Sequence, residues 1–105
     1  MTEPSDAGLL RLFDSHCHVF REEFAGDFEA MLERALSAGV EGMIVVGTTA
    51  ATSEAALDLA SRHAGLHGSA GLHPHEAGSF DETTRAQIRA LAERVDCVAI
   101  GESGL

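Results

Sequence analysis

Two histidines near the start of the sequence have the spacing of a metal-binding pair. His16 and His18 are separated only by Cys17. Because alternate side chains of a β-strand lie on one face, both imidazoles and Asp14 would point one way, with the histidine Cα atoms roughly 6.6 Å apart. Two neutral imidazoles held in this way can bind one divalent ion. With six histidines in 105 residues, however, chance spacing explains the pair about equally well.

Further polar side chains come after apolar segments later in the chain. His73 and His75 come after residues 66–72, and Glu102 directly follows the segment 98–101. At the carboxyl ends of parallel strands these residues would share one edge of a sheet, where the catalytic groups of barrel enzymes lie. A carboxylate beside a buried strand is costly unless it is paired or binds a metal. Glu102 is therefore a candidate metal ligand, with a structural ion pair as the alternative.

The apolar pattern between these residues predicts alternating strands and helices. Segments without alternation suit strands buried on both faces, whereas apolar residues spaced three and four apart suit helices. We predict strands at about 10–18, 41–48, 67–73 and 97–102, and helices at about 27–38, 53–64 and 81–94. The expected helix caps are Asp27, then Thr52 or Ser53, then Ser79 in a capping box with Glu82.

This order of elements predicts an α/β fold whose parallel strands are joined by right-handed helical crossovers. The strands end about 25 to 30 residues apart, which is the usual length of a βα unit in a (β/α)8 barrel. Such a barrel needs about 250 residues and eight units. We therefore expect residues 1–105 to form one partial domain, the N-terminal part of a TIM barrel with about three and a half βα units. Residues 1–8 are expected to be frayed, and the first strand to be buried.

Composition limits the partners of this domain. The chain has 7 arginines and no lysine against 17 acidic residues, which gives a formal net charge of −10. Such a charge repels nucleic acids and anionic membranes, so a polyanionic substrate would need a local positive centre such as a metal. The N-terminus lacks the pattern of a signal peptide, and no apolar segment is long enough to span a bilayer. We therefore expect a cytoplasmic protein without a membrane partner.

Three motifs resemble those of the TatD-type metal-dependent hydrolases, a family of TIM barrels often described as deoxyribonucleases. They are FDSHCH at 13–18, GLHPH at 71–75 and GESGL at 101–105. The motifs occur in the order of the family and at similar intervals, and together they extend along nearly the whole chain. Ser103, where the family more often has an apolar residue, is a minor departure.

The resemblance implies a role for each candidate site residue. His16 and His18 are implied to bind a metal, and Glu102 to bridge two metals. His73 is implied to line the substrate pocket, and His75 is a second candidate there. The implied cofactors are two divalent ions (Zn²⁺, Mn²⁺ or Mg²⁺) about 3.5–4 Å apart, and the implied reaction is hydrolysis of phosphodiester bonds in DNA or a related substrate.

The chain departs from the family after its fourth strand. The family takes further histidine ligands from strands five and six and an aspartate from strand eight, and this aspartate is the expected general base. We therefore identify no catalytic residue within residues 1–105. The chain is expected to be truncated, to have little activity alone, and to self-associate through its open sheet.

Three alternatives remain open. A barrel hydrolase of the amidohydrolase type would act on C–N bonds, but many such enzymes carry a carbamylated lysine where this chain has Glu102, and the chain contains no lysine. A D-aminoacyl-tRNA deacylase would share the same site residues. The third alternative is a non-enzymatic fragment that acts only as an interaction module.

Overall fold

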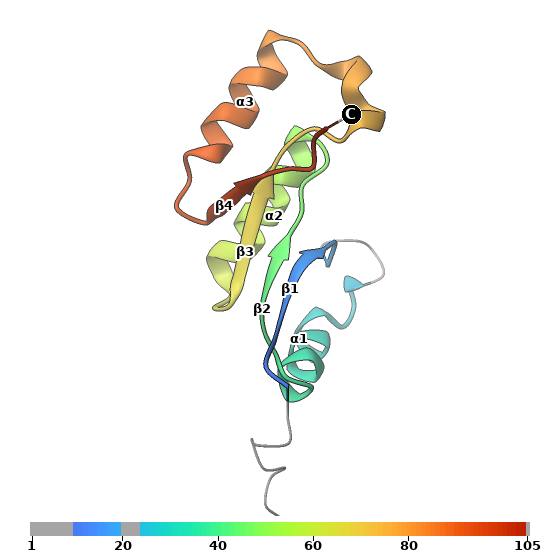
Figure 1. The fold of residues 1–105 in the computed structure, drawn as a ribbon, viewed down its shortest axis with the longest axis vertical. Coiled ribbons are helices and arrows are strands. Elements are labelled where there is room, and N and C mark those ends of the chain that lie inside the picture. The colour runs from blue at the N-terminus through green and yellow to red at the C-terminus, as the bar shows by residue number, and fades with distance from the viewer. Residues whose placement is uncertain (1–9, 20–23, 105) are drawn as a thin grey trace, which may run out of the picture.

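The computed structural model describes residues 10–19 and 24–104, and the segment 1–8, expected to be frayed, lies outside them. Along the described chain, strands alternate with helices in the predicted order (Figure 1). The elements are β1 (Leu12–Cys17), α1 (Phe28–Ser37), β2 (Val40–Val45), α2 (Ala50–Arg62), β3 (Leu66–Ala70), the 3₁₀ helix η3 (Pro74–Ser79), α3 (Glu82–Ala92) and β4 (Cys97–Ile100). Only η3 was not predicted. None of these helices is long and apolar enough to cross a membrane.

The four strands form one sheet in the order β1-β2-β3-β4, and every neighbouring pair is parallel. Val45 of β2, for example, lies opposite Gly68 of β3, and Ala70 of β3 lies opposite Ile100 of β4. This confirms the predicted α/β fold, with the topology of the first part of a TIM barrel. Because all strands run the same way, their carboxyl ends lie at one edge of the sheet.

The hydrophobic core lies between the sheet and the helices α1 and α2. Its buried residues are Val19, Met43, Val45, Ala56, Ala60 and Leu66. Leu57 of α2 is also fully buried and packs over Gly68. A Cβ atom at Gly68 would lie 2.6 Å from Leu57 Cδ2, so the absence of a side chain there lets α2 approach the sheet.

Two helices begin at caps that differ from the prediction. Thr49 caps α2: its Oγ1 accepts the Thr52 N–H at 3.0 Å, while Thr52 Oγ1 accepts the Thr49 N–H at 2.8 Å. Asp81 caps α3, and its carboxylate accepts the Thr84 N–H at 2.8 Å. This bond lowers the pKa of Asp81 because it stabilises the charged carboxylate. The predicted caps, Thr52 or Ser53 for the second helix and Ser79 for the third, are therefore wrong.

The outer strands β1 and β4 are exposed to solvent. Within the described residues, β1 pairs only with β2, and β4 only with β3. Apolar side chains on these two strands are about half exposed or more, namely Leu12, Phe13, Val98 and Ile100. The prediction of a buried first strand is therefore wrong, because β1 lies at an edge of the sheet.

Candidate metal centre

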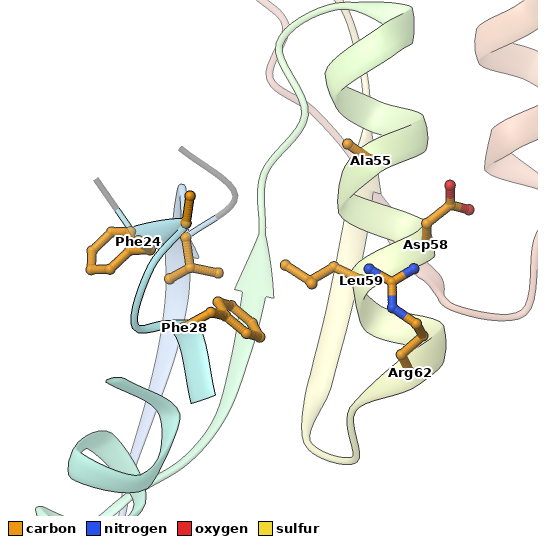
Figure 2. A pocket seen from close by; sticks show the side chains of 8 residues that line it. Phe24, Phe28, Ala55, Asp58, Leu59 and Arg62 are labelled. Atoms are coloured by element: carbon orange, nitrogen blue, oxygen red, sulfur yellow. The ribbon is translucent and has the colours of Figure 1, made fainter. Parts of the chain in front are cut away.

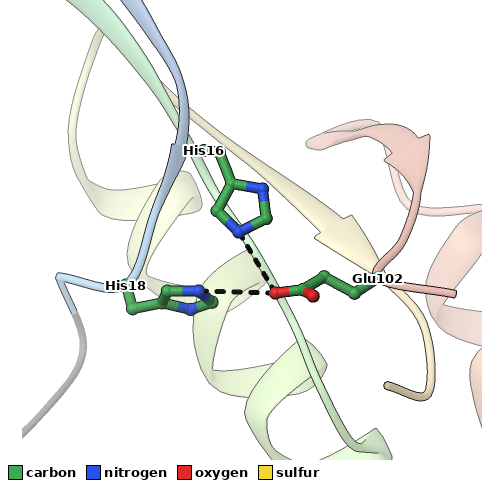
Figure 3. Close-up of side chains that lie close together, drawn as sticks. All are labelled: His16, His18 and Glu102. Carbon is green, nitrogen blue, oxygen red and sulfur yellow. Dashed lines mark hydrogen bonds and ion pairs between the residues drawn. The ribbon is translucent and has the colours of Figure 1, made fainter. Parts of the chain in front are cut away.

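Three predicted ligands from the two outer strands converge on one point (Figure 3). His16 lies in β1, His18 directly follows β1, and Glu102 follows β4. Glu102 Oε2 is 3.1 Å from His16 Nε2 and 3.4 Å from His18 Nε2. One potential ligand atom from each of the three residues lies within 4.8 Å of the other two. The structure thus brings together the three residues that the sequence singled out as ligands.

The end of β1 presents both imidazoles to Glu102. The rings of His16 and His18 meet edge to face, with their centroids 5.1 Å apart. Asp14 is not part of the group that His16, His18 and Glu102 form. Its carboxylate accepts the backbone N–H of His16 at 3.1 Å, and it lines a cavity together with Cys17 and His18. The register between β1 and β2 is irregular from Asp14 to Cys17, so side chains do not strictly alternate between the two faces there.

The backbone beyond β4 is held by the neighbouring strands. The Gly101 N–H donates to the carbonyl oxygen of Ala70, and the Glu102 N–H donates to that of Gly47, both at 2.9 Å. These bonds tie the segment to the carboxyl ends of β3 and β2. In Figure 3 the Glu102 side chain extends from this segment toward the two imidazoles.

The predicted substrate-side residue His73 lies on the other side of the same carboxylate. His73 Nε2 is 3.3 Å from Glu102 Oε1. The backbone N–H of His75 donates to His73 Nδ1 at 3.0 Å, so a neutral His73 ring carries its proton on Nε2. In this tautomer Nε2 has no lone pair for a metal. His73 is therefore a hydrogen-bond donor beside the ligand group.

The second predicted substrate-side residue, His75, is placed less closely. Its ring packs against the His73 ring with centroids 4.7 Å apart, and the residue is exposed. His75 thus contacts His73, which in turn lies beside Glu102. Its position is compatible with the outer wall of a substrate site.

The donor set of the group suits a divalent metal ion. Imidazole nitrogens and carboxylate oxygens are common ligands of Zn²⁺, and both also bind Mn²⁺. The His16 side chain is 55% exposed, whereas those of His18 and Glu102 are 19% and 23% exposed. The group is therefore open to solvent on the His16 side. The same contacts also suit hydrogen bonds between imidazole and carboxylate, so metal ligation by these residues stays a prediction.

One cavity lies away from the ligand group, between α2 and the residues that precede and begin α1. Its volume is about 350 Å³. In Figure 2, Phe28 and Leu59 of α2 point toward one another, and Arg62 extends from α2. None of the predicted site residues lines this cavity, so it belongs to the packing of the helices rather than to the candidate site.

A second cavity, of about 540 Å³, extends beneath α1 and reaches His18. Cys17 and Asp14 contribute to its lining. Burial, followed by the charge of Asp14, raises the pKa of the Cys17 thiol to about 11. In the metal-free chain Cys17 is therefore a neutral thiol at neutral pH, which makes it a poor nucleophile.

Two buried serines bond backbone groups near the segment that carries Glu102; the sequence predicted no role for Ser69, and for Ser53 only that of a helix cap. Ser53 of α2 is 0% exposed, and Ser69 of β3 is 2% exposed. Both hydroxyls form hydrogen bonds with backbone groups at the strand ends. The signal that could have found Ser69 is a hydroxyl within a buried strand, because a buried hydroxyl needs hydrogen-bond partners.

Comparisons with known proteins agree on one family. The family model described as "TatD related DNase" matches residues 13–105. The 3'-5' ssDNA/RNA exonuclease TatD of Enterobacter lignolyticus is 43% identical over 94 residues, which cover 90% of this chain and 36% of that protein. The protein of the same name from Erwinia amylovora is 43% identical over 95 residues, covering 90% of this chain and 37% of its own length.

A solved structure shares the fold. The crystal structure of YjjV, a TatD homologue from Escherichia coli, superposes with a TM-score of 0.82 and 38% sequence identity. The match covers 90% of this chain and 38% of that chain. The chain thus spans little more than a third of the length of the relatives that it matches.

Proposed function

Because this chain belongs to the family of TatD-related DNases, we propose that it forms the first part of a divalent-metal-dependent hydrolase that cleaves phosphodiester bonds in nucleic acid. The observation that carries the proposal is the meeting of His16, His18 and Glu102 at the carboxyl end of the sheet. Relatives named as 3'-5' ssDNA/RNA exonucleases support single-stranded DNA or RNA as the substrate class.

We propose that these three residues are the metal ligands contributed by this chain. His16 and His18 would each offer an Nε2 lone pair, and Glu102 would offer the oxygen that faces them, Oε2. In the complete site, two divalent ions (Zn²⁺, Mn²⁺ or Mg²⁺) would supply Lewis acidity and positive charge at the phosphate. That positive centre is what a chain with a formal net charge of −10 needs to bind a polyanion.

His73 and His75 are proposed to contact the substrate. The tautomer of His73 gives it an Nε2–H donor, and its Nε2 lies 3.3 Å from Glu102 Oε1. An N–H donor at this position could also bond a phosphate oxygen next to the carboxylate. His75, on the exposed side of His73, would contact a more distant part of the nucleic acid.

Activity is proposed to need groups beyond those of residues 1–105. The described residues supply three ligands in this group, and neither Asp14 nor His73 adds a fourth. The resemblance to the family places the further ligands and the general base on later strands. We therefore propose that the 105 residues alone have little nuclease activity, and that their exposed strands β1 and β4 promote association.

The test is a fusion of residues 1–105 to the complementary C-terminal part of the E. coli relative. Circular dichroism establishes folding, and hydrolysis of end-labelled single-stranded DNA is measured with Mn²⁺ and with a chelator. We expect metal-dependent cleavage by the fusion, little by residues 1–105 alone, and loss in a His16→Ala, His18→Ala fusion. A folded fusion that does not cleave, or that cleaves equally well without the two histidines, would contradict the proposal.

A further inference from the structure

The peptide unit that joins Gly101 to Glu102 is held by a ring of three hydrogen bonds. The Ser69 hydroxyl donates to the carbonyl oxygen of Gly101 at 2.8 Å. The same hydroxyl accepts the Gly47 N–H at 3.3 Å. The Glu102 N–H donates to the Gly47 carbonyl oxygen at 2.9 Å. Both polar groups of this peptide unit are therefore bonded, one to Ser69 and one to Gly47.

This ring of hydrogen bonds lies just beyond the carboxyl end of β4. β4 ends at Ile100, so Gly101 and Glu102 lie beyond its last residue. A hydroxyl can donate one hydrogen bond and accept others, and the ring uses both abilities of Ser69. No aliphatic side chain could join the Gly47 N–H to the Gly101 carbonyl. Because Ser69 is 2% exposed, water has little access to replace the hydroxyl.

We propose that Ser69 is a positioning residue for the candidate metal centre. By fixing the peptide unit next to Glu102, it directs the carboxylate at His16 and His18 across the end of the sheet. The proposal rests on the proposed function in one respect, namely that Glu102 is a metal ligand. Hydrogen-bond partners of this kind orient metal ligands, and their removal typically lowers metal affinity about 10- to 100-fold.

Ser53 offers a matched control. It is 0% exposed, and its hydroxyl also bonds two backbone groups, accepting the Gly71 N–H at 3.1 Å and donating to the Gly71 carbonyl at 3.3 Å. Its hydroxyl makes no hydrogen bond to the peptide unit before Glu102. Ser53→Ala therefore removes a buried hydroxyl of the same kind whose two hydrogen bonds lie outside the ring, although the hydroxyl packs beside Gly47.

The first experiment measures Zn²⁺ affinity of the 105-residue chain by calorimetry and the visible spectrum of its Co²⁺ form. Ser69→Ala should weaken Zn²⁺ binding about 10- to 100-fold and alter the Co²⁺ spectrum. Ser53→Ala should change both much less, because its hydroxyl bonds Gly71 and not the ring. Ser69→Cys keeps the shape in a slightly larger side chain that is a weaker donor and acceptor, and it should also bind less tightly than the parent. Parent-like binding by a folded Ser69→Ala or Ser69→Cys chain, or an equal loss in Ser53→Ala, would overturn the proposal.

The second experiment needs no metal. Hydrogen exchange at the Glu102 amide, followed by NMR in the metal-free chain, reports the bond to Gly47 directly. Ser69→Ala or Ser69→Cys should accelerate this exchange selectively, and Ser53→Ala should not. Unchanged exchange refutes the role of Ser69 whether or not the chain binds metal. If exchange accelerates in the variant but the parent chain binds no Zn²⁺, the result would support the role of Ser69 in the ring of hydrogen bonds and refute the assignment of Glu102 as a metal ligand.

Discussion

His16 Nε2 and Glu102 Oε2 lie 3.1 Å apart, although the residues are 86 positions apart in the sequence and come from the two outermost strands of the sheet. In a flat sheet, three strand spacings would separate those strands by about 14 Å. The contact therefore depends on curvature of the sheet together with long side chains that reach across its concave side. Curvature of this kind is what a barrel requires.

Removing both histidines of the pair should abolish metal binding. We expect the 105-residue chain to bind Zn²⁺ or Mn²⁺ weakly, because it offers only three ligands, and to bind less tightly in acid, because a protonated imidazole has no lone pair for a metal. Calorimetric titration of a His16→Ala, His18→Ala variant should show no heat of metal binding. His63→Ala is the control, since His63 lies beside Phe28 and Glu29. Equal affinity of parent and double variant would remove the assignment.

Neutralising Glu102 should slow the completed enzyme. In the fusion with a C-terminal half, Glu102→Gln keeps the shape of the side chain and removes the charge that would hold two cations, so turnover should fall about 10²-fold or more. Steady-state rates on single-stranded DNA measure this, and circular dichroism controls for folding. Turnover equal to that of the unmutated fusion would show that Glu102 has a structural role.

A side chain at Gly71 should displace the segment that carries Glu102. A Cβ atom there would lie 2.5 Å from the Gly101 carbonyl carbon and 2.6 Å from the Glu102 carbonyl oxygen. Gly71→Ala should therefore lower both the melting temperature and the Zn²⁺ affinity. Gly78→Ala is the matched control, because a Cβ atom at Gly78 meets nothing within 4 Å. Thermal melts and titrations that cannot distinguish the two variants would count against this geometry.

The Cys17 thiol should resist alkylation near neutral pH. Its pKa is raised to about 11 in the folded chain, from an ordinary value of 9.0. The neutral thiol is therefore favoured by folding, so its contribution to stability is fully present below pH 9 and is lost as the pH rises toward 11. Iodoacetamide labelling followed by mass spectrometry should show slow modification of Cys17 at about pH 8 and fast modification after unfolding. Equally fast labelling in both states would contradict this environment.

The exposed outer strands should cause self-association. Phe13 of β1 and Ile100 of β4 are both more than half exposed, and apolar edge strands promote contact between chains. Sedimentation velocity should detect oligomers of the parent, and a Phe13→Ser, Ile100→Ser variant should shift toward monomer. Val95→Ser, at an exposed position in the turn before β4, should not have this effect. A monomeric parent would refute the prediction.

The sequence was sufficient to predict the order of the elements and the three residues that meet at the carboxyl end of the sheet. The spacing of apolar residues predicts strands and helices because it shows which face of each element is buried. The meeting of His16, His18 and Glu102 could be predicted because parallel strands bring their carboxyl ends to one edge of the sheet. The position of Asp14 could not be predicted, because it depends on an irregular register between β1 and β2. The role of Ser69 could not be predicted either, because its partners lie on two other strand ends.

The N-caps of α2 and α3 were predicted wrongly because several good capping residues lie close together before each helix. Thr49 and Thr52 are both good capping residues, and only the path of the chain out of β2 decides which one begins α2. Ser79 has the expected spacing to Glu82, but its hydroxyl donates to the carbonyl of Glu76 within η3, which leaves Asp81 to cap α3. Competing caps within a few residues cannot be ranked from residue type alone.

The placement of the ligand group on the first and last strands also has a consequence for folding. An ion held by His16, His18 and Glu102 would act as a reversible cross-link that closes a loop of 86 positions and fixes the curvature of the sheet. An ion that binds only the folded chain stabilises it by about 2.7 kcal/mol when its free concentration is about 100 times the dissociation constant. Because folded domains are stabilised by only about 5–15 kcal/mol, such a cross-link would be a substantial share of the stability of residues 1–105.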